Sequence, residues 1–332
     1  MSNEELVSII MPCYNAANYI YEAMISIEKQ TYSNLELIIV DDGSTDKSYE
    51  IINRFKKESS LKIEYFCQKN KGVSVARNKG IQLAHGHYLI FMDADDVISK
   101  SFISSLVFYS DKNMPSVCHF SRDLKKVLDV REQDITSETM NIEQLARIVM
   151  RRNPPINFCN FIFFANVIKE NHLYFLTDLK YGEDNEFMWK YVSFFEKFTY
   201  INAPLYGYRI NYKSASFSQT DRIIDSVTAI ERVIQYMKDN KQKTELCNQL
   251  EDYMLPRTKL AVIKDFAKQG NHKAYTLYRT NKYTKCDYYK IGNAYMTVKE
   301  LVANFLIFYL PTCFYYTIRI IYKLSLYRFF MK

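Results

Sequence analysis

Glycine and proline are scarce in this sequence, with 8 and 7 residues among 332. This scarcity excludes collagen-like repeats and makes long flexible linkers unexpected, because both are rich in these residues. Charge of one sign is not in large excess either, since the formal net charge is +7 and the basic residues are spread along most of the chain. No nucleic-acid partner is predicted, because such proteins concentrate basic residues in a patch or stripe.

Cysteine occurs without any recognisable pattern. The seven residues are widely scattered, with no CxxC pair and no histidine at zinc-binding spacing. We therefore interpret them as reduced thiols used for packing in a cytoplasmic protein. The N-terminal segment, residues 1–15, lacks both the basic region and the long apolar run of a signal peptide, so export by that route is not expected.

Apolar residues are abundant: 48% of the chain is hydrophobic and 24% is charged, which is typical of a folded globular protein. Four short runs rich in β-forming residues lie at 6–11, 35–40, 61–66 and 87–92. Stretches with helical periodicity separate them. This alternation predicts βαβ units and a parallel sheet, which is an α/β nucleotide-binding architecture with ligands at the carboxyl ends of the strands.

Three helices are predicted between these strands. Apolar residues recur at helical spacing over 19–27 and again after the cluster Ser44-Thr45-Asp46, which is suited to capping a helix start. A third helix is expected over 73–84, with Gly86 as a left-handed C-terminal cap. Further along, residues 111–145 are more polar and are interpreted as a connection or a variable surface element.

The last part of the chain differs from the rest. Residues 301–318 contain no charge, and the four charged residues that follow are all basic. Eighteen uncharged residues barely reach the ~18 to 20 needed to span a bilayer, and Pro311 and Asn304 interrupt them. An interfacial or re-entrant helix at the cytoplasmic membrane face is therefore favoured. The alternative is a helix that packs its aromatic face on the protein's own core.

Polar residues follow each of the four predicted strands, at 12–15, 41–44, 68–72 and 93–96. In a parallel sheet these positions meet at one edge. Their chemistry fits a nucleotide: Tyr14 can stack on a base, Asp41 or Asp42 can accept from a base or ribose, and Lys71 or Arg77 can face phosphate oxygens.

Neither common phosphate-binding fingerprint is present, because the chain has no GxxxxGK[ST] and no GxGxxG after its first strand. Asp93 and Asp95 instead stand two positions apart at a strand end, where both can turn toward one cation. Mg²⁺ and Mn²⁺ prefer a few carboxylates together with phosphate oxygens. The sequence therefore predicts a metal-bound diphosphate as the ligand.

Four segments in order, VSIIMPCYNAANYI, LIIVDDGSTDKS, NKGVSVARNKGI and GHYLIFMDADD, make residues 6–98 resemble the N-terminal half of a family 2 glycosyltransferase of the GT-A fold. The resemblance implies a mixed α/β sheet flanked by helices, a nucleotide-sugar donor such as a UDP-sugar, Mn²⁺ or Mg²⁺, and inversion at the anomeric carbon. It also implies a glycan or lipid-linked acceptor in cell-surface polysaccharide synthesis.

The resemblance also assigns roles to residues of this chain. Asp93 and Asp95 match the metal-binding DxD motif, and Arg77 matches an element near the nucleotide. Asp96 is an extra acid, and a helix cap or a hydrogen-bond acceptor is at least as good an interpretation as a metal ligand. The residues matched to nucleoside contacts are Pro12, Tyr14, Asn15 and Asp42.

An inverting displacement needs a base that takes the acceptor's proton. By resemblance that base is Asp184, with Glu183 beside it as an orienting or acceptor-binding residue. The alternative is that both belong to a solvated acidic turn opening a helix. Arg209, in the segment PLYGYRIN, is a further candidate for touching the donor, with a surface salt bridge as the alternative.

The organisation predicted from these observations has a GT-A catalytic domain over 1–215, divided into a nucleotide-sugar half (1–110) and an acceptor half (146–215). A helical accessory region (216–295) and a basic, aromatic membrane-associating tail (296–332) follow. Two competing hypotheses are a nucleotidyltransferase and a catalytically degenerate nucleotide-sugar or glycan-binding protein. The oligomeric state is not indicated by any motif.

Overall fold

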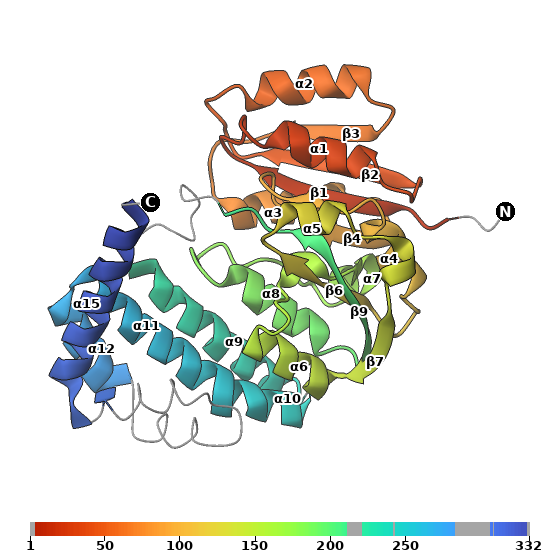
Figure 1. Cartoon of the computed structure of the whole chain (residues 1–332). Coiled ribbons are helices and arrows are strands. Elements are labelled where there is room, and N and C mark those ends of the chain that lie inside the picture. Colours follow the sequence, from red (N-terminus) through yellow and green to blue (C-terminus); the bar gives the residue numbers. More distant parts are fainter. Residues whose placement is uncertain (1–3, 211–220, 242, 283–305, 308, 331–332) are drawn as a thin grey trace. The chain divides into compact units, whose positions relative to one another are not determined.

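The fold is given by a computed structural model, and the structure describes residues 4–210, 221–241, 243–282, 306–307 and 309–330. The chain forms two compact units, Met1–Ser216 and Phe217–Lys332 (Figure 1). Parts of the predicted accessory region and tail lie outside the described residues, as does Cys286. The two units are considered one at a time below.

A five-stranded sheet with the order β3-β2-β1-β4-β8 forms the centre of the first unit. Its first four strands are parallel and confirm the four predicted runs, whereas β8 pairs antiparallel with β4. β2 is buried along its whole length, and six of seven residues in β1 are buried, as expected for strands covered on both faces. The strands are β1 (Val7–Cys13), β2 (Leu35–Asp41), β3 (Lys62–Cys67), β4 (Tyr88–Phe91) and β8 (Phe163–Phe164).

The three predicted helices between these strands are confirmed as α1 (Ile20–Glu28), α2 (Ser48–Glu58) and α3 (Val73–Leu83). The predicted capping cluster does not supply the N-cap of α2, which is Lys47 without a side-chain capping bond, although Asp46 accepts from the backbone N–H of Ser48. The remaining helices of this unit are α4 (Phe102–Phe108), α5 (Leu124–Leu128), α6 (Ile142–Arg151), α7 (Ala165–Glu170) and α8 (Glu183–Val192).

The prediction for Gly86 was wrong. Helix α3 ends at Leu83, its C-cap residue Ala84 is extended, and Gly86 is not among the left-handed glycines of the described residues. The glycine is needed for space instead: a Cβ atom there would lie 2.7 Å from the backbone nitrogen of Ser8 and 2.8 Å from the carbonyl oxygen of Leu6. Sequence alone cannot distinguish these two uses of a glycine after a helix.

A second sheet contains β5, β9 and β6 in that order, with β7 also paired to β9. Its strands are β5 (Val97–Ile98), β6 (Ser116–Ser121), β7 (Ser137–Asn141) and β9 (Lys197–Gly207). Two of them, β6 and β7, fall within 111–145, so the interpretation of that region as a connection was wrong, whereas the mostly exposed β7 agrees with the alternative of a surface element. The signal was weak because β7 buries only Met140 of its five residues.

An aromatic core lies beneath the end of β4. The ring of Phe91 packs against those of Phe158, Phe163, Phe175 and Phe187, with centroids 5.2–5.8 Å apart. The rings of Phe175 and Phe187 are stacked at 4.1 Å with an interplanar angle of 7°. This cluster joins the carboxyl end of β4 to helix α8 and accounts for part of the high aromatic content.

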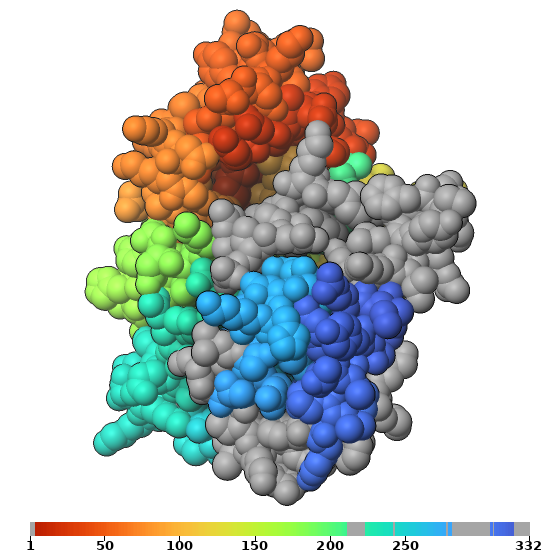
Figure 2. Space-filling view, turned by 90° about the vertical axis from the view of Figure 1, so that its left-hand side faces the viewer, coloured from red at the N-terminus to blue at the C-terminus, as the bar shows by residue number. Residues whose placement is uncertain are grey.

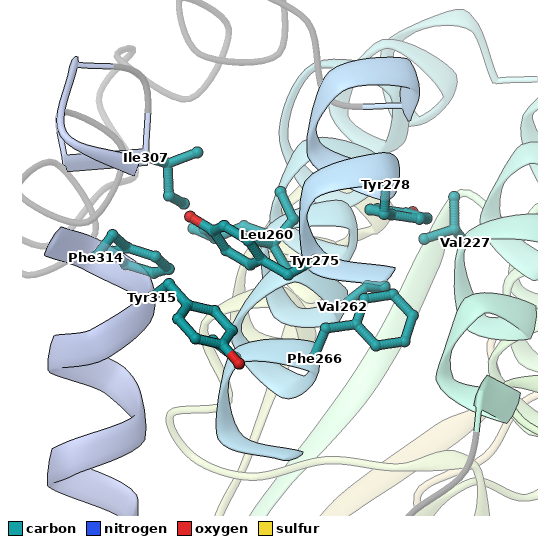
Figure 3. Close-up of a cluster of buried hydrophobic side chains, with 11 residues drawn as sticks. Val227, Leu260, Val262, Phe266, Tyr275, Tyr278, Ile307, Phe314 and Tyr315 are labelled. Atoms are coloured by element: carbon teal, nitrogen blue, oxygen red, sulfur yellow. The ribbon is translucent and has the colours of Figure 1, made fainter. Parts of the chain in front are cut away.

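The described part of the second unit is helical, and its buried core is shown in Figure 3. The cluster includes Leu260 and Phe266 of α11, Tyr275 of α12, and Phe314 and Tyr315 of α15. The described α-helices of this unit are α9 (Asp225–Asp239), α10 (Thr244–Gln249), α11 (Leu255–Gln269), α12 (His272–Lys282) and α15 (Pro311–Phe330).

The C-terminal helix α15 lies alongside α12 at the surface of this unit (Figure 2). Phe314 and Tyr315 are buried in the unit's core, so packing on the protein itself explains part of the tail. Tyr316, Ile320 and Ile321 are more than half exposed, so another part of the helix presents apolar residues outward. Among the described helices, none combines the length and the apolar character of a membrane span.

The cysteine interpretation holds in part. Four cysteines are buried, as packing residues should be: Cys13, Cys118, Cys159 and Cys247. Cys67 and Cys313 are exposed, so packing does not explain them. All six described cysteines are free thiols.

Candidate functional site

The loops after β1 and β2 are held together by Asn15. This residue has a positive φ of 50°, its backbone N–H donates to Ser44 Oγ at 2.9 Å, and its Oδ1 accepts from the N–H of Thr45 at 2.8 Å. Asparagine tolerates this left-handed conformation better than most residues. Tyr14, which lies between β1 and Asn15, is 53% exposed. Pro12 is half-buried in β1.

Asp42 is buried and organises the loop that precedes α3. Its Oδ1 accepts from Gln68 Nε2 and from the N–H of Lys71, each at 2.8 Å, and its Oδ2 accepts from the N–H of Gly72 at 2.7 Å. The Lys71 residue itself is exposed. Asp41, the open alternative from sequence, is occupied elsewhere, since its Oδ2 accepts from the hydroxyl of Tyr65 at 2.8 Å.

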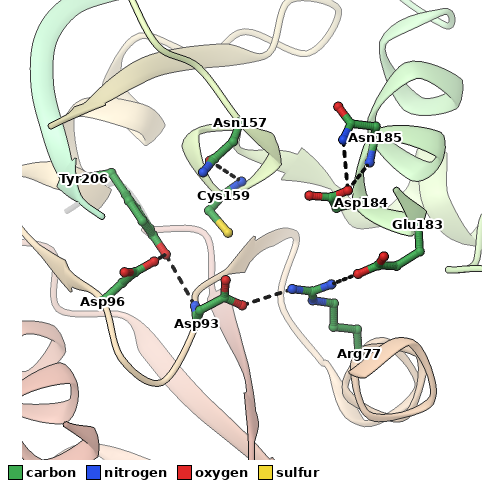
Figure 4. Close-up of polar contacts among 9 residues, drawn as sticks. All are labelled: Arg77, Asp93, Asp96, Asn157, Cys159, Glu183, Asp184, Asn185 and Tyr206. Carbon is green, nitrogen blue, oxygen red and sulfur yellow. Dashed lines mark hydrogen bonds and ion pairs between the residues drawn. The ribbon is translucent and has the colours of Figure 1, made fainter. Parts of the chain in front are cut away.

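Arg77 connects two acidic segments that are far apart in the sequence (Figure 4). Its Nη2 donates to Asp93 Oδ1 and its Nη1 donates to Glu183 Oε1, both at 3.0 Å. Asp93 follows β4, Glu183 begins α8, and Arg77 lies on α3. The structure therefore brings the first acid of the DxD motif and the predicted base segment to opposite sides of one guanidinium group.

The guanidinium of Arg77 is enclosed by aromatic rings. Its Cζ lies 4.5 Å from the ring centroid of Phe158 and 5.3 Å from that of Phe175. Burial alone would lower the pKa of Arg77, but the carboxylates of Asp93 and Glu183 outweigh this effect and raise it, so the side chain stays charged. Arg77 Nε has no hydrogen-bond partner within the described structure.

Asp96 is a hydrogen-bond acceptor, one of the two alternatives considered from sequence. It is buried, and it accepts from the Tyr206 hydroxyl at 2.7 Å and from the backbone N–H of Arg209 at 2.8 Å. Burial, followed by the charges of Asp93 and Asp95, raises the pKa of Asp96 well above its usual range. These bonds fix the strand end that carries the two preceding acids.

Arg209 lies against the same turn. Its Nε donates to the backbone oxygen of Asp95 at 2.8 Å, and its Nη2 forms an ion pair with Glu22 at 2.5 Å. Its side chain is 22% exposed, and its Cζ lies 5.4 Å from the ring centroid of Tyr19. The chain that follows β9 therefore brings a positive charge to the turn that carries Asp95 and Asp96.

Helix α8 begins at Glu183, one residue before the predicted base Asp184. Gly182 precedes it with a left-handed φ of 87°, which a residue with a Cβ atom rarely adopts. Glu183 is buried, and burial followed by the charge of Asp184 raises the pKa of Glu183 against the lowering effect of Arg77. Asp184 is only partly buried, and its Oδ1 accepts from the N–H and the Nδ2 of Asn185 at 2.7 and 3.0 Å. The alternative of a solvated acidic turn is therefore wrong for Glu183, because this residue is buried.

The two DxD acids can be compared with the needs of a divalent cation. Over the described residues, no group of three or more His, Cys, Asp or Glu side chains is arranged to hold a metal. Asp93 is 34% exposed and Asp95 is partly exposed, which suits a cation bound by one or two carboxylates that completes its shell with phosphate oxygens and water. A metal site made of protein ligands alone does not fit.

Two further residues build this site: Asn78, which by resemblance belongs with Arg77 to the element near the nucleotide, and Cys159, which sequence reasoning treated only as a packing residue. Asn78 holds Phe175 by two hydrogen bonds, from Asn78 Nδ2 to the backbone oxygen and from the backbone N–H to Asn78 Oδ1, each at 2.8 Å. Cys159 is buried next to Arg77 and Asp93, and burial raises the pKa of its thiol. These contacts join segments that are far apart in the sequence, so no local sequence pattern predicts them.

The fold and these strand-end acids define a class: a glycosyltransferase of the GT-A type. The model of the family "Glycosyl transferase family 2" matches residues 8–171. Glycosyltransferase GlyG of Streptococcus pneumoniae is 32% identical over 235 residues, which cover 65% of this chain and 74% of that protein. Minor teichoic acid biosynthesis protein GgaB of Bacillus subtilis is 26% identical over 72% of this chain and 27% of its own length.

Solved structures show the same fold. S. aureus TarS 1-349 in complex with UDP-GlcNAc superimposes with a TM-score of 0.62 at 17% identity, covering 96% of this chain and 92% of that one. The mannosyltransferase PcManGT from Pyrobaculum calidifontis, in complex with GDP-Man and Mn²⁺, gives 0.60 at 16% identity, covering 97% and 85%. At these identities the likeness concerns the fold alone. By its sequence relatives, the chain belongs to glycosyl transferase family 2.

Proposed function

We propose that this glycosyltransferase moves a sugar from a UDP-sugar to a glycan or lipid-linked acceptor in cell-surface polymer synthesis, with inversion at the anomeric carbon. One observation carries the proposal: Arg77 bridges Asp93, at the end of β4, to Glu183, at the start of α8. A direct displacement needs a site for the leaving diphosphate and a base on a separate element. The bridge supports this proposal, because Arg77 is bound both to a candidate metal ligand and to the residue that directly precedes the candidate base Asp184.

The donor is expected along the carboxyl ends of β1, β2 and β4. The exposed Tyr14 is assigned to the base, and the neighbouring Pro12, Asn15 and Asp42 are assigned to the nucleoside side of this strand edge. The exposed Lys71 and the partly exposed Arg209 supply positive charge for the diphosphate. The UDP-GlcNAc and GDP-Man named in the titles of the structural neighbours support a nucleotide-sugar as the donor class.

Asp95 and Asp93 would hold Mn²⁺ or Mg²⁺, which when bound offsets the charge that develops on the departing diphosphate. The Mn²⁺ named for the mannosyltransferase neighbour supports this assignment. Asp184 would remove the proton from the attacking hydroxyl. Glu183 would orient the start of α8, because its carboxylate is bound to Arg77 and buried.

The acceptor is proposed only as a class of molecule, from the surface of helix α15 and from one sequence relative. We propose that α15 binds an anionic membrane surface, where lipid-linked acceptors are present, because Tyr316, Ile320 and Ile321 are exposed and residues 301–332 contain no acid. The teichoic acid biosynthesis named for GgaB supports a cell-surface polymer as the product class.

The test is a panel of nucleotide-sugars, scored for hydrolysis with Mn²⁺, with Mg²⁺ and with EDTA. A UDP-sugar is expected to be hydrolysed only with metal, and Asp95→Ala should abolish the reaction. Asp134→Ala, which removes an exposed acid of the same unit, is the matched control and should leave it unchanged. The proposal fails if calorimetry detects no binding of UDP or GDP in the presence of Mn²⁺.

A further inference from the structure

Two successive residues of α3 hold the segment that leads to the candidate base. Asn78 binds the backbone of Phe175 through both its N–H and its carbonyl oxygen, at 2.8 Å each. Arg77 binds Glu183 Oε1 at 3.0 Å, at the first residue of α8. The stretch 175–183 is thus fixed at both ends by neighbouring side chains of one helix, and Asp184 directly follows it.

The second terminal nitrogen of Arg77 binds the proposed metal ligand Asp93. Nη2 donates to Asp93 Oδ1 at 3.0 Å, and the arginine is only 5% exposed. Phe158 and Phe175 lie within 4.5 and 5.3 Å of its guanidinium carbon. Both Nη atoms are thus held by carboxylates, and a phosphate that took the place of either one would leave that carboxylate without its counter-charge.

We propose that Arg77 is a positioning residue that couples the metal-binding carboxylate to the base-bearing helix, in place of a ligand for the donor's diphosphate. One Asp93 oxygen is held by Arg77, so the orientation of this partly exposed carboxylate is set before any cation arrives. The other arm fixes Glu183 and with it the first turn of α8. A planar, two-armed guanidinium can join both carboxylates, whereas an ammonium group is a compact point charge.

This inference rests on the proposed function, because it takes Asp93 as a metal ligand. Partners that orient a metal ligand typically change metal affinity or activity by about 10–100-fold when they are removed. Arg77→Lys keeps the positive charge but removes the two-nitrogen group that binds both carboxylates, so it tests the link between Asp93 and Glu183 apart from the charge. Glu183→Gln keeps the shape of the second partner and removes its charge.

The control is Glu186→Gln on the same helix. Glu186 is also a fully buried carboxylate of α8, but its ion-pair partner is Lys190. A general cost of removing a buried acid from α8 would therefore appear in this variant as well as in Glu183→Gln. Thermal unfolding of all variants shows which of them remain folded.

Two readouts that need no turnover test the coupling: calorimetric titration of Mn²⁺ in the presence of saturating UDP, and hydrogen exchange of the amides at 182–185 in metal-free protein. Arg77→Lys is expected to weaken Mn²⁺ binding by about 10–100-fold and to accelerate exchange at these amides. Glu183→Gln should accelerate exchange too, while Glu186→Gln should change neither readout appreciably.

The inference is overturned if Arg77→Lys leaves the exchange of 182–185 unchanged, or if Glu186→Gln reproduces its effects. Loss of UDP affinity at saturating Mn²⁺, with exchange unchanged, would identify Arg77 as a donor ligand instead. Failure of the wild-type protein to bind Mn²⁺ and UDP would refute the proposed function, and the exchange experiment would still decide whether Arg77 holds the helix start.

Discussion

Replacing Asp184 by Asn removes the proposed base while preserving its shape. Asp184 Oδ1 accepts two hydrogen bonds from Asn185, and an asparagine oxygen can replace Oδ1 in both. The lost negative charge at the first turn of α8 costs about 0.3–1 kcal/mol. Weakening bonds that were made to a charged acceptor adds about 1 kcal/mol. The variant should therefore remain folded, because domains are stable by about 5–15 kcal/mol.

The effect on chemistry should be larger than the effect on stability. A general base contributes about 10²–10⁴-fold to the rate, which corresponds to about 2.7–5.4 kcal/mol of activation free energy. We expect kcat for metal-dependent hydrolysis of the UDP-sugar to fall by this factor, because water must also lose a proton to attack. The KM for the donor should change little, since Asp184 lies on α8 and the donor residues lie at the strand ends.

The assay is release of UDP at saturating Mn²⁺, measured for the wild type, Asp184→Asn and the control Glu186→Gln. Urea unfolding of the same three proteins separates lost stability from lost chemistry. A rate for Asp184→Asn within about tenfold of the wild type, in protein that is fully folded, would refute the assignment of the base, because it falls below the smallest contribution of about 10²-fold.

Three further predictions follow from other parts of the fold. Glu36→Gln should reduce the free energy of unfolding by about 1–3 kcal/mol at neutral pH, because Glu36 is 1% exposed and holds three donors. Burial raises the pKa of Glu36, but the hydrogen bonds outweigh burial and lower it. The loss of stability in Glu36→Gln should therefore be complete above about pH 4.3 and should shrink as the pH falls through the folded-state pKa of Glu36. Urea unfolding of both proteins at several pH values measures this loss. Gly86→Ala should destabilise by about 1–3 kcal/mol, since the added Cβ meets the Ser8 nitrogen at 2.7 Å; thermal unfolding measures it. Ile320→Ser with Ile321→Ser should reduce binding to anionic vesicles without unfolding the second unit, and unchanged vesicle sedimentation would argue against a membrane role for α15.

The parallel sheet could be predicted from sequence because its strands are short, continuous apolar runs bounded by polar loops. The second sheet could not, because its contribution from 137–141 exposes four of five residues and therefore lacks an apolar face. Gly86 shows the same limit on a smaller scale: a glycine after a helix is compatible with a cap, and only the neighbouring strand reveals the close approach.

The candidate site was predictable where chemistry follows a strand. The acids after β4 were singled out because they follow a predicted strand, and the pair at the start of α8 was singled out by resemblance to the family, but the contacts of these residues were not predicted. The bond between Arg77 and Glu183 spans 106 residues, and that between Asn78 and Phe175 spans 97. No local periodicity encodes pairings at such separations. They result from packing α3 against the aromatic core, which a single sequence does not specify.

The three hydrogen bonds that Asp42 accepts have a consequence for how the protein meets a nucleotide. They close the loop over 68–72 during folding, so its backbone is ordered before any ligand arrives. Binding then avoids much of the ordering cost that a loose loop would carry, which is about 0.5–1.5 kcal/mol for each immobilised side chain. Loss of Asp42 would therefore shift that cost from folding to binding, and would weaken affinity even for a ligand that the carboxylate never touches.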